Sequence, residues 1–134
     1  MGCGGARTGA AGAPSANAPM PASAEAEARA LLAFYNPIYP SLYNEASRTA
    51  WIASTDVTAE HTGQRTGAST VFSAFAGNAM FIQRGRALLS QASLLADPTR
   101  RQIRQMLLLA ADAPQTNPDL ARRRVAAESR QSAL

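Results

Sequence analysis

The residue types that most often carry chemistry are scarce in this chain of 134 residues. His61 is the only histidine and Cys3 the only cysteine. Glu60 stands directly before His61, so an acid lies next to an imidazole, two groups that serve in acid–base catalysis and in metal binding. A catalytic zinc ion needs three protein ligands, however, and no second histidine follows His61 at i+4. We therefore expect Glu60 and His61 to be an exposed feature of a helix start.

Other catalytic patterns are missing from the sequence as well. It contains no Gly-x-x-x-x-Gly-Lys phosphate loop and no Gly-x-Ser-x-Gly nucleophile elbow. Glu45 has no partner carboxylate at i+3 or i+4, so paired-carboxylate chemistry has no candidates there. The sequence predicts no catalytic, cofactor-binding or metal-binding residue, and hence no enzymatic activity for this chain alone.

Cys3 is the one candidate for covalent modification. Myristoylation of the Met1-Gly2 start requires Ser or Thr at position 6, where Ala6 stands. A Gly-Cys pair followed by small residues is also typical of the lipid-modified cysteine of a bacterial lipoprotein. The alternative is an incidental cysteine in a tail. No signal peptide is predicted, because residues 1–20 lack an apolar central region.

The residues that carry these groups must be positioned by helices, and the first predicted helix covers residues 24–54. Ser23 is a suitable N-cap, and acidic side chains follow in the first turn, where they interact favourably with the helix dipole. Pro37 and Pro40 each remove a backbone donor, so we expect a kink or a short break near 36–40. The predicted buried face has helical spacing and consists of Leu31, Tyr35, Ile38 and Leu42.

The corner Thr55-Asp56-Val57-Thr58 leads to a second long helix, predicted over 58–93. Asp56 or Thr58 supplies its N-cap. Its apolar face comprises Phe72, Phe75, Ala79, Ile82 and Leu89. Its glycines lower the intrinsic helicity by up to about 1 kcal/mol each. We expect packing to compensate, with a neighbouring helix approaching closely at the small residues Gly63, Gly67, Gly77 and Gly85.

Two further helices begin at proline. Asp97-Pro98 predicts an N-cap and a first helical residue for a helix over 98–112. Asn117-Pro118 repeats the pattern, so a fourth helix starts at 118. The expected core residues are Ile103, Met106, Leu107 and Ala110 in the third helix, and Leu120, Val125 and Ala126 in the fourth. Because the fourth pattern has barely begun at Leu134, we expect a chain cut short.

These patterns together predict an all-α fold of long antiparallel helices. The aromatic residues recur at helical spacing, which favours a core over a cofactor pocket; they are Phe34, Tyr35, Tyr39, Tyr43, Phe72, Phe75 and Phe81. No apolar run approaches the roughly 18 to 20 residues of a membrane span, so no transmembrane segment is predicted.

Composition separates a tail from the helical part. Residues 1–23 consist mainly of Gly, Ala, Pro, Ser and Asn, which bury too little apolar surface to offset chain entropy, so they predict a disordered tail. The formal charge is +4, and all 13 basic residues are arginine. These arginines are scattered rather than gathered in a continuous stripe with stacking aromatics, so the sequence predicts no nucleic-acid partner.

Four segments in order resemble a known family: Ala24-Glu25-Ala26-Glu27-Ala28, Tyr43-Asn44-Glu45-Ala46-Ser47, Ala50-Trp51-Ile52-Ala53-Ser54-Thr55-Asp56-Val57-Thr58 and Asp97-Pro98-Thr99-Arg100-Arg101-Gln102. Residues 24–134 thereby resemble the N-terminal region of the angiotensin-converting-enzyme family of zinc peptidyl-dipeptidases (M2 peptidases), in a bacterial version. The corner is the distinctive segment, because the family commonly has Trp, a few residues and then a Thr-Asn-Ile-Thr-like turn. Asp56 replaces the asparagine, and Pro37 and Pro40 stand where a family helix runs unbroken.

The resemblance implies a larger, almost wholly helical enzyme with a deep cleft, over which helices 24–54 and 58–93 form a lid. The family holds zinc through His-Glu-x-x-His and a downstream glutamate, and the first glutamate activates the bound water. No position of this chain matches those residues, so zinc is expected only in the full-length enzyme. The implied partners are the remainder of the peptidase domain and peptide substrates. The implied location of the intact enzyme is extracytoplasmic, either in the periplasm or as an outer-membrane lipoprotein.

The leading hypothesis is therefore an N-terminal fragment of an M2-type peptidase that supplies the lid without catalysis. The alternative is a stand-alone helical binding module, lipid-tethered through Cys3. An arginine-bearing nucleic-acid binder is a third and weaker hypothesis.

Overall fold

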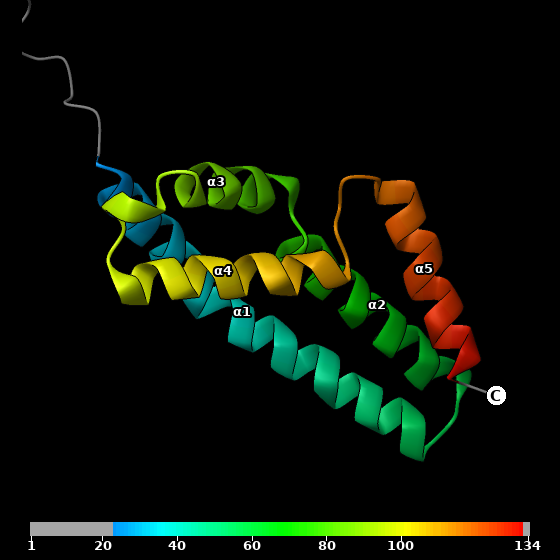
Figure 1. Cartoon of the computed structure of the whole chain (residues 1–134). Coiled ribbons are helices and arrows are strands. Elements are labelled where there is room, and N and C mark those ends of the chain that lie inside the picture. Colours follow the sequence, from blue (N-terminus) through cyan, green and yellow to red (C-terminus); the bar gives the residue numbers. More distant parts are fainter. Residues whose placement is uncertain (1–22, 133–134) are drawn as a thin grey trace, which may run out of the picture.

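The computed structural model describes residues 23–132, and every regular element in that range is helical. The elements are α1 (Ala24–Thr55), α2 (Ala59–Ala76), α3 (Ala79–Leu89), the short 3₁₀-helix η1 (Ala92–Leu94), α4 (Asp97–Asp112) and α5 (Pro118–Gln131). Figure 1 shows α1 and α2 as an antiparallel pair, with α3 and α4 across the amino-terminal part of α1 and α5 beside α2. The predicted all-α fold is confirmed.

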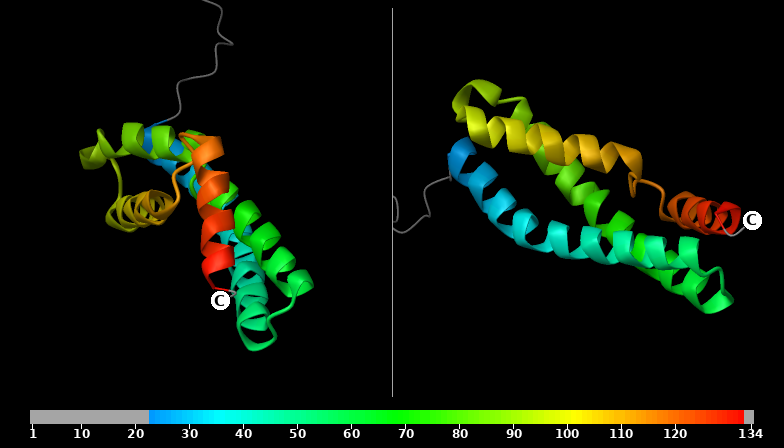
Figure 2. Two further views of the ribbon diagram at one scale, coloured as in Figure 1. Left: turned by 90° about the vertical axis from the view of Figure 1, so that its right-hand side faces the viewer. Right: turned by 90° about the horizontal axis from the view of Figure 1, so that it is seen from below.

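Helix α1 runs through both prolines without a break. The Oγ of Ser23 accepts a hydrogen bond from the backbone N–H of Ala26 at 3.2 Å, as its predicted N-cap role requires. Pro37 and Pro40 both lie inside the helix. α1 bends in its cyan segment in the right-hand view of Figure 2. The expected disturbance at the prolines therefore takes the form of a bend within a continuous helix.

The prediction of one helix over 58–93 is wrong, because the chain leaves the helical path twice. α2 ends at Ala76 and α3 begins at Ala79, with Gly77 and Asn78 between them. The side-chain oxygen of Asn78 accepts from the N–H of Met80 at 2.9 Å, so Asn78 serves as the N-cap of a new helix. A second departure follows Leu89, where the chain enters η1.

The break at Gly77 has a tertiary cause. A Cβ atom at this position would overlap the carbonyl oxygen of Ala113, in the linker between α4 and α5. The carbonyl oxygen of Gly77 accepts from the N–H of Gln115 at 2.9 Å, which fixes the two segments together. Gly85 similarly lies against Met106 and Leu107 of α4. The expected close approaches are therefore confirmed at these two glycines, whereas Gly63 and Gly67 face open space.

Helix α4 starts one residue earlier than predicted. Its N-cap is Ala96, which makes no side-chain cap, and Asp97 lies inside the first turn, so the prediction of Asp97 as the N-cap is wrong. The capping acceptor comes from α1 instead. One carboxylate oxygen of Glu25 accepts from the N–H of Ala96 at 2.9 Å, and the other accepts from the hydroxyl of Thr99 at 2.8 Å.

The core lies where α1, α3 and α4 meet. Phe81, Ile103 and Met106 are the largest fully buried side chains. The other buried members of the cluster are Ala28, Leu31, Leu32, Tyr35, Leu88 and Leu95. The predicted stripe of α4 is confirmed, with Ile103, Met106 and Ala110 buried and Leu107 half-buried. The aromatic residues predicted for the core differ in burial. Tyr35 and Phe81 are buried, whereas Phe34 and Tyr43 are at least half exposed.

Helix α5 starts at Pro118 as predicted, with the side chain of Asn117 accepting from the N–H of Leu120. It packs mainly on α2, and its buried residues are Val125 and Ser129. Leu120, a predicted core residue, is 63% exposed, so that expectation is wrong.

Candidate functional site

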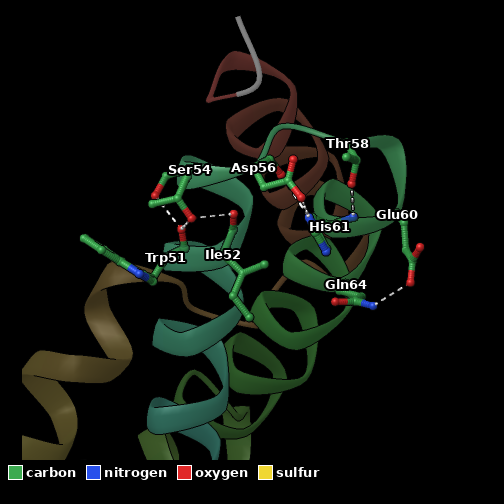
Figure 3. Close-up of polar contacts among 9 residues, drawn as sticks. Trp51, Ile52, Ser54, Asp56, Thr58, Glu60, His61 and Gln64 are labelled. Atoms are coloured by element: carbon green, nitrogen blue, oxygen red, sulfur yellow. Dashed lines mark hydrogen bonds and ion pairs between the residues drawn. The ribbon is translucent and has the colours of Figure 1, made fainter.

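The corner between α1 and α2 is held by local hydrogen bonds. The N–H of Asp56 donates to the carbonyl of Ile52 at 2.9 Å, which ends α1. The hydroxyl of Thr58 accepts from the N–H of His61 at 3.1 Å and so caps α2. Of the two predicted N-caps, Thr58 therefore takes the role. Figure 3 shows these contacts within one short loop.

His61 is paired with Asp56 across this loop. Its Nδ1 lies 3.0 Å from the carbonyl oxygen of Asp56 and 3.2 Å from the carboxylate Oδ2 of the same residue. Because both neighbours are acceptors, Nδ1 carries the imidazole proton. This pair was not predicted from the sequence. The clue in the sequence is that His61 follows Asp56 by five residues across a capped corner, which brings the first turn of α2 back toward the loop.

The neighbouring Ser54 and Glu60 lie apart from His61 in the corner (Figure 3). The hydroxyl of Ser54 donates to the carbonyl of Trp51 at 2.7 Å, and Figure 3 shows Ser54 on the side of the loop away from His61. Glu60 points away from the imidazole and accepts from Gln64 at 3.3 Å. Within residues 23–132, no group of three or more His, Cys, Asp or Glu side chains is placed to hold a metal ion. The chemistry of the corner is that of a helix cap.

Trp51 is the most exposed aromatic residue of this region. Its side chain is 71% exposed and extends outward from α1, away from the Asp56–His61 pair (Figure 3). Val57, in the corner itself, is 56% exposed. Large apolar side chains at a corner gain nothing from exposure to water. They are therefore candidates for contact with another surface.

An apolar hollow lies between α2, the α4–α5 linker and α5. It has a volume of about 490 Å³, and its lining includes Phe72 of α2 together with Leu120 and Val125 of α5. Asp112, Arg124 and Glu128 are the charged residues that line it. A second hollow of similar volume lies between α1 and α2, where Gly67 and Val71 face Leu42 and Thr49. Neither hollow was predicted from the sequence, because each is formed by packing between separate helices.

Tyrosine side chains extend along α1 toward the first hollow. The rings of Tyr35, Tyr39 and Tyr43 follow one another at centroid distances of 5.4 and 6.0 Å, and Phe72 contacts the last two. Burial raises the pKa of Tyr39, and the electrostatic interactions with Tyr43 and Asp112 raise it further. The aromatic residues thus form a continuous packed stack that ends at the wall of the hollow.

Cys3, the candidate for lipidation, and the predicted tail of residues 1–23 lie outside the described residues, apart from Ser23. Among residues 23–132, no helix is long and apolar enough to cross a bilayer.

Comparisons with protein-family models, with curated proteins and with solved structures found no match to this chain.

Proposed function

We propose that this chain is the N-terminal helical part of a zinc peptidyl-dipeptidase of the M2 family, where α1 and α2 cover part of the active-site cleft. The chain contributes no catalytic group. Zinc and the catalytic residues belong to the remainder of the enzyme, which is the partner of these helices, and the substrates are peptides. The enzyme acts outside the cytoplasm.

The observation that supports the proposal is a set of large apolar side chains that are exposed on the helices and the corner. Trp51, Val57 and Val71 of the α1–α2 hairpin are each more than half exposed. Leu94 and Leu108 of the η1–α4 region are exposed to a similar degree. Contact with the remainder of a larger domain would remove these side chains from water, which is favourable. The resemblance of the Trp51–Thr58 corner to the M2 family supports the choice of a peptidase domain.

The test is to sequence the reading frame beyond the codon of Leu134 and to express its whole product. The expected frame encodes His-Glu-x-x-His, and its product releases C-terminal dipeptides from peptides with a strict requirement for zinc. The 134-residue chain is the matched control and is expected to be inactive with zinc present. A stop codon directly after Leu134 would contradict the proposal.

The second candidate is a stand-alone helical binding module tethered through Cys3. It is favoured by the self-contained core, in which Phe81, Ile103 and Met106 are fully buried within this one chain. The module is expected to be monomeric and to unfold cooperatively on its own, whereas lid helices are expected to self-associate through their exposed apolar surface. Sedimentation velocity and thermal unfolding of the 134-residue chain distinguish the two candidates.

A further inference from the structure

The hollow between α2 and α5 has the size and the lining of a binding site. Its volume of about 490 Å³ is within the range of small-ligand pockets, roughly 300 to 1,000 Å³. Phe72, Leu120 and Val125 supply its apolar wall. Leu120 belongs to this wall and still leaves most of its surface in water. An apolar group that entered the hollow would therefore cover side chains that are now solvated.

The electrostatics of the hollow favour a cation. Two carboxylates and one guanidinium line it, and the guanidinium of Arg124 is already engaged. Its Nε donates to Glu128 at 2.7 Å, and its Nη1 donates to the backbone carbonyl of Asp112. Among residues 23–132, no ion pair involves the carboxylate of Asp112. One negative charge thus remains at the hollow without a paired cation.

The position of Asp112 strengthens this negative potential. Asp112 is the last residue of the 16-residue helix α4, whose last turn contains no basic side chain. The negative end of the helix dipole and the carboxylate therefore lie together. The guanidinium of Arg124 contacts this end at the backbone carbonyl of Asp112, and its ion pair is with Glu128. The positive end of α5 opens at the same linker, but the Asn117 side chain caps it and Asp119 lies in its first turn. These two groups offset the positive end of α5.

We propose that this hollow binds a peptide segment in which a large apolar side chain stands next to an arginine or a lysine. The apolar side chain occupies the space beside Phe72 and Leu120, and the cation lies at Asp112. Ser69, Ser73 and Gln115 line the same hollow and offer hydroxyl and amide groups to the peptide backbone. This site goes beyond the peptidase assignment and does not depend on it, because it is complete within the 134-residue chain.

The test is a titration of the ¹⁵N-labelled 134-residue chain with the capped dipeptide N-acetyl-Leu-Arg-amide, followed by amide chemical shifts. We expect saturable shifts at Ser73, Gln115 and Leu120. N-acetyl-Leu-Glu-amide is the matched probe and is expected to bind at least about fivefold more weakly, as one exposed charge pair would allow. Raising the salt concentration from about 20 to 300 mM is expected to weaken the first peptide only.

Matched variants separate the site from general surface charge. Asp112→Asn is expected to weaken binding of the Arg peptide about fivefold. Asp119→Asn removes an acid of α5 that does not line the hollow and pairs with Arg122, so binding is expected to stay unchanged. Both acids are exposed, and thermal unfolding of each variant verifies the fold.

Several outcomes would overturn the proposal. Equal affinity for the Arg and Glu peptides would show that the hollow does not select a cation. Equal losses of affinity in the Asp112→Asn and Asp119→Asn variants would show that Asp112 is not the binding carboxylate. If 3-methylbutylamine bound as tightly as the Arg peptide, the hollow would recognise a simple apolar amine and not a peptide. Amide chemical-shift changes confined to residues outside the hollow would show that the peptide binds elsewhere. None of these results bears on whether the frame beyond Leu134 encodes a peptidase.

Discussion

At the scale of single residues, the hydroxyl of Tyr35 is the least expected feature of the core. Tyr35 is 4% exposed, and its hydroxyl has no hydrogen-bond partner. Its ring contacts Phe75 and Phe81 at centroid distances of 5.2 and 5.2 Å. The sequence predicted Tyr35 as a core position, but only the surrounding rings exclude a partner for its oxygen. Burial raises the pKa of Tyr35 to about 12.

We predict that Tyr35→Phe is neutral or stabilising, by up to about 1 kcal/mol, because it removes a buried group that lacks a hydrogen bond. Tyr39→Phe, at a half-buried position in the same stack, is the control and should change stability less. Urea unfolding monitored by circular dichroism measures both. Destabilisation of Tyr35→Phe by more than about 1 kcal/mol would show that the hydroxyl is bonded after all.

The raised pKa of Tyr35 also predicts a response to alkali. Its folded pKa of about 12 exceeds the ordinary value of 10.0, so the unfolded chain loses this proton first. The contribution to stability is therefore fully present below about pH 10 and is lost as the pH rises toward 12. Tyr35→Phe should lose less stability than the wild type between pH 9 and 12 in the same unfolding measurement. Parallel losses in the two proteins would contradict the assignment.

Glu25 is the second residue whose role came only from tertiary structure. The sequence placed it in the first turn of α1, where acids favour the helix dipole. The structure also makes it the acceptor for the start of α4, about 70 residues further along the chain. Hydrogen bonds from the backbone of Ala96, from Arg29 and from Thr99 lower the pKa of Glu25 below its ordinary value of 4.5.

We predict that Glu25→Gln lowers the melting temperature at pH 7 and that this difference disappears in acid. The folded pKa is depressed, so the stabilisation is present above about pH 4.5 and is lost as the pH falls through the folded pKa. Melting temperatures from pH 7 down to pH 2 measure the effect. Glu45→Gln is the matched control, because Glu45 pairs only with Arg48 on the surface of α1 and should matter little.

At the scale of elements, the glycines of the segment predicted as one helix have different roles. The sequence predicted that small residues allow close approach, and this is confirmed at Gly77 and Gly85. It did not distinguish these from Gly63 and Gly67, because all four carry the same intrinsic helix penalty. Only the position of the α4–α5 linker against Gly77 determines which glycine is required. The same contact explains why the predicted helix divides there.

We predict that Gly77→Ala destabilises the protein by about 1 to 3 kcal/mol, because the added methyl group collides with the carbonyl of Ala113. Gly63→Ala and Gly67→Ala should stabilise it by up to about 1 kcal/mol each, because their Cβ atoms meet nothing within 4 Å. Chemical unfolding compares the three variants. If Gly77→Ala left the stability unchanged, the α4–α5 linker would not be in close contact with Gly77.

At the scale of the whole molecule, the exposed apolar side chains bear on what the chain is part of. Trp51 is the only tryptophan, so its fluorescence reports on the α1–α2 corner alone. With 71% of its surface exposed, it should be quenched efficiently by acrylamide in the 134-residue chain. If the proposed peptidase domain covers the corner, we expect weaker quenching and blue-shifted emission in the full product. Identical quenching in both proteins would place Trp51 outside any such contact.

The sequence by itself determined the helical class, the caps at Ser23 and Asn117, and the buried stripe of α4, and it limited the cap of α2 to Asp56 or Thr58. These features depend on interactions within one or two helical turns, so periodicity and side-chain type suffice to predict them. Only the tertiary structure decided where the second long helix divides, which acid caps α4 and where the hollow beside α5 forms. Each of these depends on contacts between segments far apart in the chain, which no local pattern encodes.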